Sequence, residues 1–250
     1  MAKEQIEKYG RDNPWVLVNV FGRFPPGGLN TLISIDELNF SCKRIYRDGE
    51  FRNSPKILGV DCARYGLDSS VIFPRQGLIA YEPIVLRNVD GIEGAQTVSR
   101  KANNWEVDAI FIDDSGGFGA SWIDNLLQMG KSPIGIHFNS KPSSPQYFNK
   151  RAEMAFECVN WIRRGGCIPD IRELKEALYK TTYSFKEDKL IIEPKEDIKE
   201  KLGYSPDHMD ALLLTFAMPV EKLTNFVGQH SSHQFEYNPL DRNRIRCETL

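Results

Sequence analysis

The sequence lacks the features that mark a membrane-spanning, exported or zinc-finger protein. No apolar run in its 250 residues approaches the roughly 20 residues needed to span a bilayer. The opening segment MAKEQIEKYGRDNPW has no apolar signal-peptide core, so nothing in it directs export. The five cysteines are scattered, odd in number and never spaced as C-x-x-C. This pattern favours reduced thiols over a disulfide framework or a zinc site.

An excess of positive charge is also missing. The formal net charge is −2, whereas a protein that coats duplex DNA needs clustered Lys and Arg to neutralise phosphates. Charge alone therefore does not indicate a nucleic-acid partner. The 41% apolar and 26% charged residues are typical of a globular protein, and the chain is long enough to bury a substantial core.

The apolar pattern predicts an α/β fold. Three apolar runs with tight connections begin at Lys56 and indicate an antiparallel meander. From Ile92 onward, helical spacing alternates with single buried strands, which predicts parallel strands joined by helices. A later hairpin turns near Glu187-Asp188. The expected strands are KILGVDCA, SSVIFPR, GLIAYEPIVL, DAIFIDD and PIGIHF, and the expected helices cover residues 92–105, 120–129, 149–165, 170–180 and 205–218.

The order β-β-β-α-β-α-β-α is that of the ribonuclease H-like fold, with a mixed sheet of the five-stranded type flanked by helices. Residues 1–55 carry loop signals and are expected to be a lead-in without a core of their own. Residues 56–220 are expected to form the folded domain. Residues 221–250 are polar and are expected to be a tail. In the last helix, Ser205 should cap the N-terminus and Pro206 should take the first helical position.

Four carboxylates are placed where they can converge. Asp61 ends the first strand and Asp113 ends the fourth, and ligands gather at such strand ends in an open sheet. Asp207 and Asp210 are three residues apart on the last helix and so share one face. Converging acids need cations, and hard oxygen ligands suit Mg²⁺ or Mn²⁺. Two such ions would support phosphodiester hydrolysis, although the spacing leaves open which acid of the helical pair dominates.

Each acid also has an ordinary interpretation. An Asp at a strand end is usually a turn former or a helix cap, and Asp207 could simply favour the helix dipole. Asp210 has no obvious local purpose between apolar neighbours. The four acids in this order favour a functional site, whereas Asp68, Asp114 and Asp124 are expected to be surface or capping acids. The glycines of GGFG, after the fourth strand, are expected to let backbone approach the site.

An ordered set of motifs resembles the nuclease domain of phage terminase large subunits of the headful-packaging type. The matching segments are GVDCARYGLDSSVI, FIDDSGGFGASWIDNL, NKRAEM and IIEPKEDIKEKLGYSPDHMDALLLTFA. The resemblance implies an endonuclease that cuts concatemeric double-stranded viral DNA with little sequence preference. The metal-binding acids of the family fall on Asp61, Asp113 and the pair Asp207 and Asp210.

The resemblance also implies contacts and partners. Arg64, Lys150, Arg151 and Lys195 lie in the matching segments and are candidate contacts to DNA. The portal protein, bound through the tail, the terminase small subunit and the ATPase domain of a full-length chain are the implied partners. The implied location is the host cytoplasm, with no membrane association and no place in the mature virion. No phosphate loop is present, so no ATP hydrolysis is expected.

Three alternatives remain open from the residues. A junction resolvase of the same fold would need a dimer interface and a strongly basic cleft. An actin-like or sugar-kinase ATPase would need a small Gly/Thr phosphate turn after Asp61, where this chain has Cys62-Ala63-Arg64-Tyr65. A non-catalytic module that docks on the portal would not need the four acids.

Overall fold

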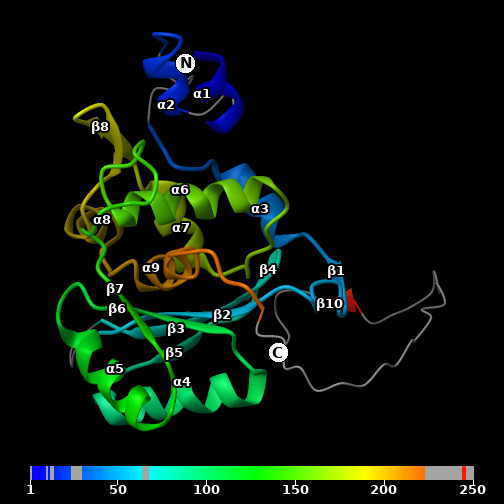
Figure 1. Cartoon of the computed structure of the whole chain (residues 1–250), viewed down its shortest axis with the longest axis vertical. Coiled ribbons are helices and arrows are strands. Elements are labelled where there is room, and N and C mark those ends of the chain that lie inside the picture. The colour runs from blue at the N-terminus through cyan, green and yellow to red at the C-terminus, as the bar shows by residue number, and fades with distance from the viewer. Residues whose placement is uncertain are drawn as a thin grey trace.

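A mixed β-sheet forms the centre of the protein (Figure 1). The computed structural model describes residues 2–9, 11, 14–23, 30–63, 68–222 and 244–245. The strands of the central sheet are β2 (Lys56–Asp61), β3 (Ser70–Gln76), β4 (Ile79–Ala80), β5 (Ile84–Leu86), β6 (Ala109–Asp113) and β7 (Ile134–Ile136).

The strand directions confirm the predicted meander followed by parallel strands. β2 pairs antiparallel with β3 and parallel with β6, and β6 pairs parallel with β7. Both β4 and β5 pair antiparallel with β3, at opposite ends of it. The order is β4-β3-β2-β6-β7, and β5 pairs with β3 outside this path.

Helices cover both faces of this sheet (Figure 1). α4 and α5 lie on one face, where the N-cap Asp90 accepts hydrogen bonds from the backbone of the first turn of α4. On the other face, α9 lies directly on β2 and β3, and α6 and α7 pack on α9. These helices are α4 (Gly91–Trp105), α5 (Phe118–Gln128), α6 (Lys150–Arg163), α7 (Arg172–Lys180) and α9 (Asp207–Leu214).

The apolar runs of the strands feed two cores. Side chains alternate across the sheet, so Ile57 and Phe73 join the core beneath α9, α6 and α7. Their neighbours Leu58 and Ile72 join the core beneath α4 and α5. Because both faces are buried, the strands read as continuous apolar runs in the sequence.

A β-hairpin and a short helix lie beyond α7. The hairpin consists of β8 (Tyr183–Lys186) and β9 (Lys189–Ile192). Its two turn residues, Glu187 and Asp188, have φ values of 52° and 58°, as a two-residue hairpin turn requires. The predicted hairpin is therefore confirmed. The helix α8 (Lys195–Leu202) follows it and was not predicted.

Part of the predicted lead-in belongs to the folded body. Leu32, Ile33 and Leu38 are buried in the core beneath α6 and α7. Ser34 and Glu37 form a capping box at the start of the helix that carries Leu38. The elements outside the central sheet at the two ends of the chain are α1 (Ala2–Tyr9), α2 (Pro14–Asn19), α3 (Ile35–Cys42), β1 (Tyr46–Arg47) and β10 (Arg244–Ile245), of which β1 and β10 pair antiparallel.

Two further expectations bear on the class of protein. None of the helices among the described residues is long and apolar enough to cross a membrane. Cys42, Cys62 and Cys158 are free thiols, whereas Cys167 is disulfide-bonded. The prediction of reduced thiols throughout is therefore wrong at Cys167. Apart from Glu221, Lys222 and β10, the predicted tail lies outside the described residues.

Candidate active site

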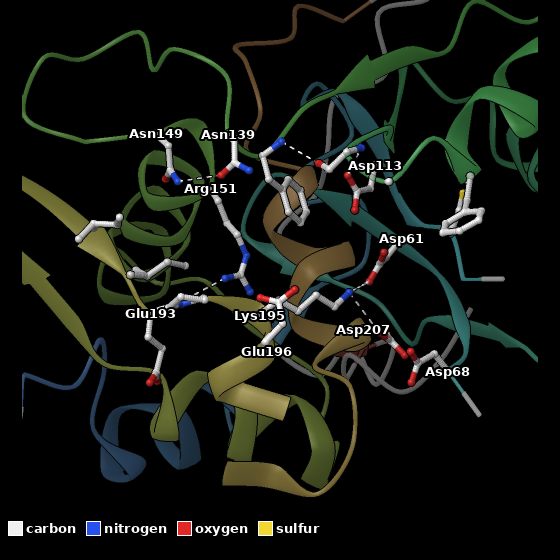
Figure 2. A pocket seen from close by; sticks show the side chains of 18 of the residues that line it. Asp61, Asp68, Asp113, Asn139, Asn149, Arg151, Glu193, Lys195, Glu196 and Asp207 are labelled. Carbon is white, nitrogen blue, oxygen red and sulfur yellow. Dashed lines mark hydrogen bonds and ion pairs between the residues drawn. The ribbon is translucent and has the colours of Figure 1, made fainter. Parts of the chain in front are cut away.

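A cleft of about 740 Å³ opens where β2, β6, α8 and α9 meet (Figure 2). Asp61, Asp113 and Asp207 line one side of it, and Lys195 lies among them. The opposite side is formed by Asn149 with its neighbour Asn139 and by residues of the hairpin. The cleft thus lies at the carboxyl ends of the parallel strands, where the sequence predicted it.

The two strand-end acids reach the cleft from adjacent parallel strands. Asp61 is the last residue of β2 and is only 3% exposed. Asp113 is the last residue of β6, and its Oδ1 accepts a hydrogen bond of 2.9 Å from the backbone N–H of Ser115. The hydroxyl oxygen of Ser115 accepts a hydrogen bond of 2.9 Å from the N–H of Phe138. Ser115 therefore ties Asp113 to the segment that follows β7.

The other two acids lie in the first turn of α9. Asp207 Oδ2 accepts a hydrogen bond of 3.1 Å from the N–H of Ser69, and Asp207 Oδ1 accepts one from the hydroxyl of Ser205. Asp210 is completely buried. The predicted cap is wrong: Pro206 takes the N-cap position, and Ser205 donates to Asp207 instead of capping the helix. The bond from the Ser205 hydroxyl to the Asp207 carboxylate is charge-assisted.

Two glycines set the distance between the elements that carry the acids. A Cβ atom at Gly59 in β2 would lie 2.1 Å from the carbonyl oxygen of Ala211, so α9 rests with its backbone on the strand that ends in Asp61. A Cβ atom at Gly119 would lie 2.1 Å from the carbonyl oxygen of Asp113, so α5 begins directly against the end of β6. The close backbone approach expected of GGFG is therefore present at Gly119.

Lys195 lies at the centre of the acids. Its Nζ is 3.0 Å from Asp61 Oδ2, 3.4 Å from Asp207 Oδ1 and 3.2 Å from Asp210 Oδ2. It is the first residue of α8, and Pro194 before it, two acids in the first turn and Gly203 at the end are ordinary helix signals. The sequence therefore offered a signal for α8 that was missed, and with it the central position of Lys195.

Burial and the close approach of like charges shift the pKa values of the side chains in the site. Burial and, to a lesser extent, the neighbouring acids raise the pKa of Asp61 to about 7, although the ammonium of Lys195 acts to lower it. Burial also raises the pKa of Asp113. Burial alone would lower the pKa of Lys195, but the surrounding carboxylates outweigh it and raise that pKa well above its ordinary value. Lys195 therefore stays protonated at neutral pH.

The pKa of Asp210 is shifted in the opposite direction, downward. Burial would raise its pKa, but the charges of Arg151 and Lys195 outweigh burial and lower it. The Oδ1 of Asp210 accepts two hydrogen bonds from Arg151. Its Oδ2 is buried and forms an ion pair of 3.2 Å with the ammonium of Lys195.

The donor set could hold a hard cation. All four acids offer carboxylate oxygens, and Asp210 Oδ2 faces the centre of the cluster, where it pairs with the ammonium of Lys195. Throughout the part of the chain that the structure describes, no group of three or more His, Cys, Asp or Glu side chains is arranged around a metal position. The ammonium of Lys195 occupies the centre of the cluster, so a cation that enters must displace it.

The candidate DNA contacts are placed differently from one another. Lys195 lines the cleft and faces the acids. Lys150 is buried, and its Nζ lies 2.6 Å from Glu153 Oε2, away from the cleft. Arg151 is buried against Asp210. Arg64 lies outside the described residues.

Other side chains on the cleft are better exposed and were missed. Lys186 lies at the end of β8, with its Nζ 4.3 Å from the ring centroid of Phe148, and both residues line the cleft. Phe118 also lines it and is 43% exposed. Asp68, expected to be a surface acid, lines the cleft while it pairs with Lys199. These positions depend on how the hairpin and the loops dock, which no local pattern reveals.

The comparisons with known proteins give one consistent result. No protein-family model and no curated protein sequence matches the chain. The nuclease domain of the large terminase subunit gp2 of bacterial virus Sf6 matches with a TM-score of 0.63 at 18% identity, covering 76% of this chain and 99% of that one. A mutant of that domain with manganese matches with a TM-score of 0.62 at 17% identity, covering 76% of this chain and 100% of that one.

A second phage protein gives the same result. The large terminase nuclease from thermophilic phage G20c with bound magnesium matches with a TM-score of 0.51 at 14% identity, covering 76% of this chain and 98% of that one. At these identities the likeness establishes the fold. The chain therefore has the ribonuclease H-like fold of the large-terminase nuclease domains, as its order of strands and helices predicted.

Proposed function

We propose that this chain is the nuclease portion of a terminase large subunit and cuts concatemeric double-stranded viral DNA during genome packaging. The fold and the motifs support this assignment, and the carboxylates at the carboxyl ends of β2 and β6 supply its chemistry. The reaction is the hydrolysis of a phosphodiester bond by water.

The observation that carries the proposal is the buried excess of negative charge. Four carboxylates converge from β2, β6 and α9, and among the described residues the cations paired with them are Lys195 and Arg151. Buried charges that are not paired are costly, so such a cluster is built to receive cations. Asp61, Asp113, Asp207 and Asp210 would hold Mg²⁺ or Mn²⁺, because structures of the same fold contain manganese or magnesium. That two ions bind is part of the proposal. The ions would supply charge stabilisation at the scissile phosphate and make water a stronger nucleophile.

The residues of the chain prepare the site for this chemistry. Ser69 and Ser205 fix the orientation of the Asp207 carboxylate, and the backbone of Ser115 fixes that of Asp113. Lys195 remains protonated, so it balances charge and does not act as a base. The three acids nearest to it are almost wholly buried, which keeps bulk water from competing for their oxygens.

Contacts to DNA are proposed to be few and mainly to phosphates. Lys186, Asn139 and Asn149 line the cleft opposite the acids and can donate to phosphate oxygens. Such contacts carry no sequence information, so cleavage should be nearly independent of sequence and should weaken with salt. The chain's net charge of −2 implies low affinity for bare duplex.

The wider setting belongs to the same proposal. Residues 221–250 would dock on the portal protein, and the ATPase domain and the small subunit would hold the DNA in place in the host cytoplasm. The chain itself would not hydrolyse ATP, since its sequence has no phosphate loop. The acids that face the cleft speak against a purely non-catalytic docking module.

The test is cleavage of supercoiled plasmid with Mn²⁺, with Mg²⁺ and with EDTA, followed by mapping of product ends on a long random duplex. The proposal predicts nicking and linearisation that require the metal, with ends spread over many sequences. Metal-independent cleavage would contradict the proposed chemistry. A tight consensus at the ends would contradict the packaging role and favour a site-specific nuclease.

A further inference from the structure

Arg151 is the residue of the cleft whose surroundings differ most from its expected role. It was expected to contact DNA, yet its side chain is only 7% exposed. Its Nε and Nη2 donate to the same oxygen, Asp210 Oδ1, at 3.2 and 2.9 Å. Its Nη1 donates to the carbonyl oxygen of Glu193 at 3.0 Å. Three of its five N–H groups are therefore used inside the protein, and they fix the guanidinium from two sides.

The two carboxylate oxygens of Asp210 have different partners. Oδ1 is committed to the guanidinium on the α6 side, while Oδ2 pairs with the ammonium of Lys195. Two donors on one oxygen prevent the carboxylate from turning, because rotation would break both bonds. The planar guanidinium is itself fixed by Glu193 and lies over the ring of Phe138, with Cζ 5.8 Å from the ring centroid.

We infer that Arg151 is a positioning residue for the cation centre: it holds Asp210 so that Oδ2 is presented to a divalent cation, and it does not contact DNA. The inference rests on the proposed function, because it assumes that a cation binds among the acids. Only a rigid fork can place two N–H groups on one oxygen and a third on Glu193, so Lys should not replace Arg here although it keeps the charge. Neither the resemblance nor the comparisons assign this role to Arg151.

The experiment measures Mn²⁺ affinity directly, from the electron paramagnetic resonance signal of free Mn²⁺, for wild type, Arg151→Lys and Arg151→Gln. Arg163→Lys is the matched control, because Arg163 lies on the same helix, is 48% exposed and pairs with Glu37 at the surface. Both Arg151 variants should bind Mn²⁺ roughly 10–100-fold more weakly, as is common when a residue that orients a metal ligand is lost. Arg163→Lys should bind like wild type.

Duplex affinity is measured in parallel, as the fluorescence anisotropy of a labelled duplex in EDTA, with circular dichroism to check the fold. Arg151→Lys and Arg151→Gln should bind the duplex as wild type does. Unchanged Mn²⁺ affinity, or weaker duplex binding with unchanged Mn²⁺ affinity, would overturn the inference. Loss of folding in both variants would also overturn it, because Arg151 would then determine the fold. If wild type itself binds no Mn²⁺, the proposed function fails first.

Discussion

Lys195 balances the charge of three buried carboxylates, so its removal should expose how strongly they repel one another. In EDTA, Lys195→Ala should melt at a lower temperature than wild type. Breaking a fully buried pair costs roughly 3–5 kcal/mol, and the loss here should be smaller because Lys195 is 30% exposed. Mn²⁺ should raise the melting temperature of Lys195→Ala more than that of wild type, since the cation replaces the missing charge.

The matched control is Lys199→Ala. Lys199 lies on the same helix and pairs with Asp68 where both side chains are exposed, so its loss should cost at most about 1 kcal/mol. If Lys195→Ala is as stable as wild type in EDTA, the ammonium is not the counter-ion of the acids.

The raised pKa of Asp61 should make the stability of the metal-free protein depend on pH. Its pKa of about 7 in the folded state lies above its ordinary value of 3.8, so the folded state binds this proton more tightly than the unfolded chain. The resulting stability is present below pH 4 and is lost as the pH rises to about 7, a change on the order of a few kcal/mol. The pKa of Asp210 is lowered, so its contribution to stability changes only when the pH falls below its ordinary pKa of 3.8. It therefore does not mask the change caused by Asp61.

Urea denaturation in EDTA at a series of pH values measures the effect. Asp61→Asn should have a shallower slope between pH 4 and 7 than wild type. Some slope should remain, because the pKa of Asp113 is also raised. The same slope in both proteins would show that Asp61 titrates normally in the folded state.

At the scale of residues, the acids could be predicted but their partners could not. Asp61 and Asp113 stand at the ends of apolar strands, and the three-residue spacing of Asp207 and Asp210 places them together on any helix. The position of Lys195 depends on how α8 docks against the rest of the protein, which is a long-range property. The sequence therefore predicted a cluster of acids and missed the ammonium within it.

At the scale of elements, the contact of α9 with β2 should tolerate no side chain at Gly59. An added Cβ would meet Ala211 O at 2.1 Å and the side chains of Thr215 and Leu214 at 3.0 and 3.1 Å. Gly59→Ala should therefore lose about 1–3 kcal/mol or more of the free energy of unfolding, as overpacked cores do. It should also slow plasmid nicking, because α9 would move away from Asp61.

Denaturation and nicking, measured at a temperature where the variant is folded, test this contact. Gly116→Ala is the stability control, since a Cβ there meets only the ring of Phe118 at an ordinary 3.4 Å. Wild-type stability and nicking in Gly59→Ala would show that α9 does not rest on β2 as described.

The burial of α6 and α9 could not be predicted from the sequence. The helix α6 was predicted, but the burial of all of its first seven residues was not; α3, α9 and the hairpin surround it. Lys150 and Arg151 therefore look like surface cations in the sequence and are interior ones in the structure. The helix α9 packs on the sheet and is enclosed between it and α6 and α7.

At the scale of the whole molecule, the sheet could be predicted because both of its faces are buried. Continuous apolar runs, such as those of β2 and β6, and the alternation of later strands with helices indicated the correct topology. The join between the lead-in and the domain could not be predicted. Leu32, Ile33 and Leu38 belong to the main core, and this follows only from contacts with α6 and α7 that are more than a hundred residues away in the chain.

The central claim is that the four converging acids cleave DNA. It is tested most directly by the rate of plasmid nicking in Mn²⁺ for Asp113→Asn and for its neighbour Asp114→Asn. Asp114 follows the same strand but pairs with His137 and does not line the cleft. Asp113→Asn should lose more than the roughly 10–100-fold typical of residues that only support a ligand, with an unchanged circular dichroism spectrum. Asp114→Asn should nick at close to the wild-type rate, and wild-type nicking by Asp113→Asn would contradict the account.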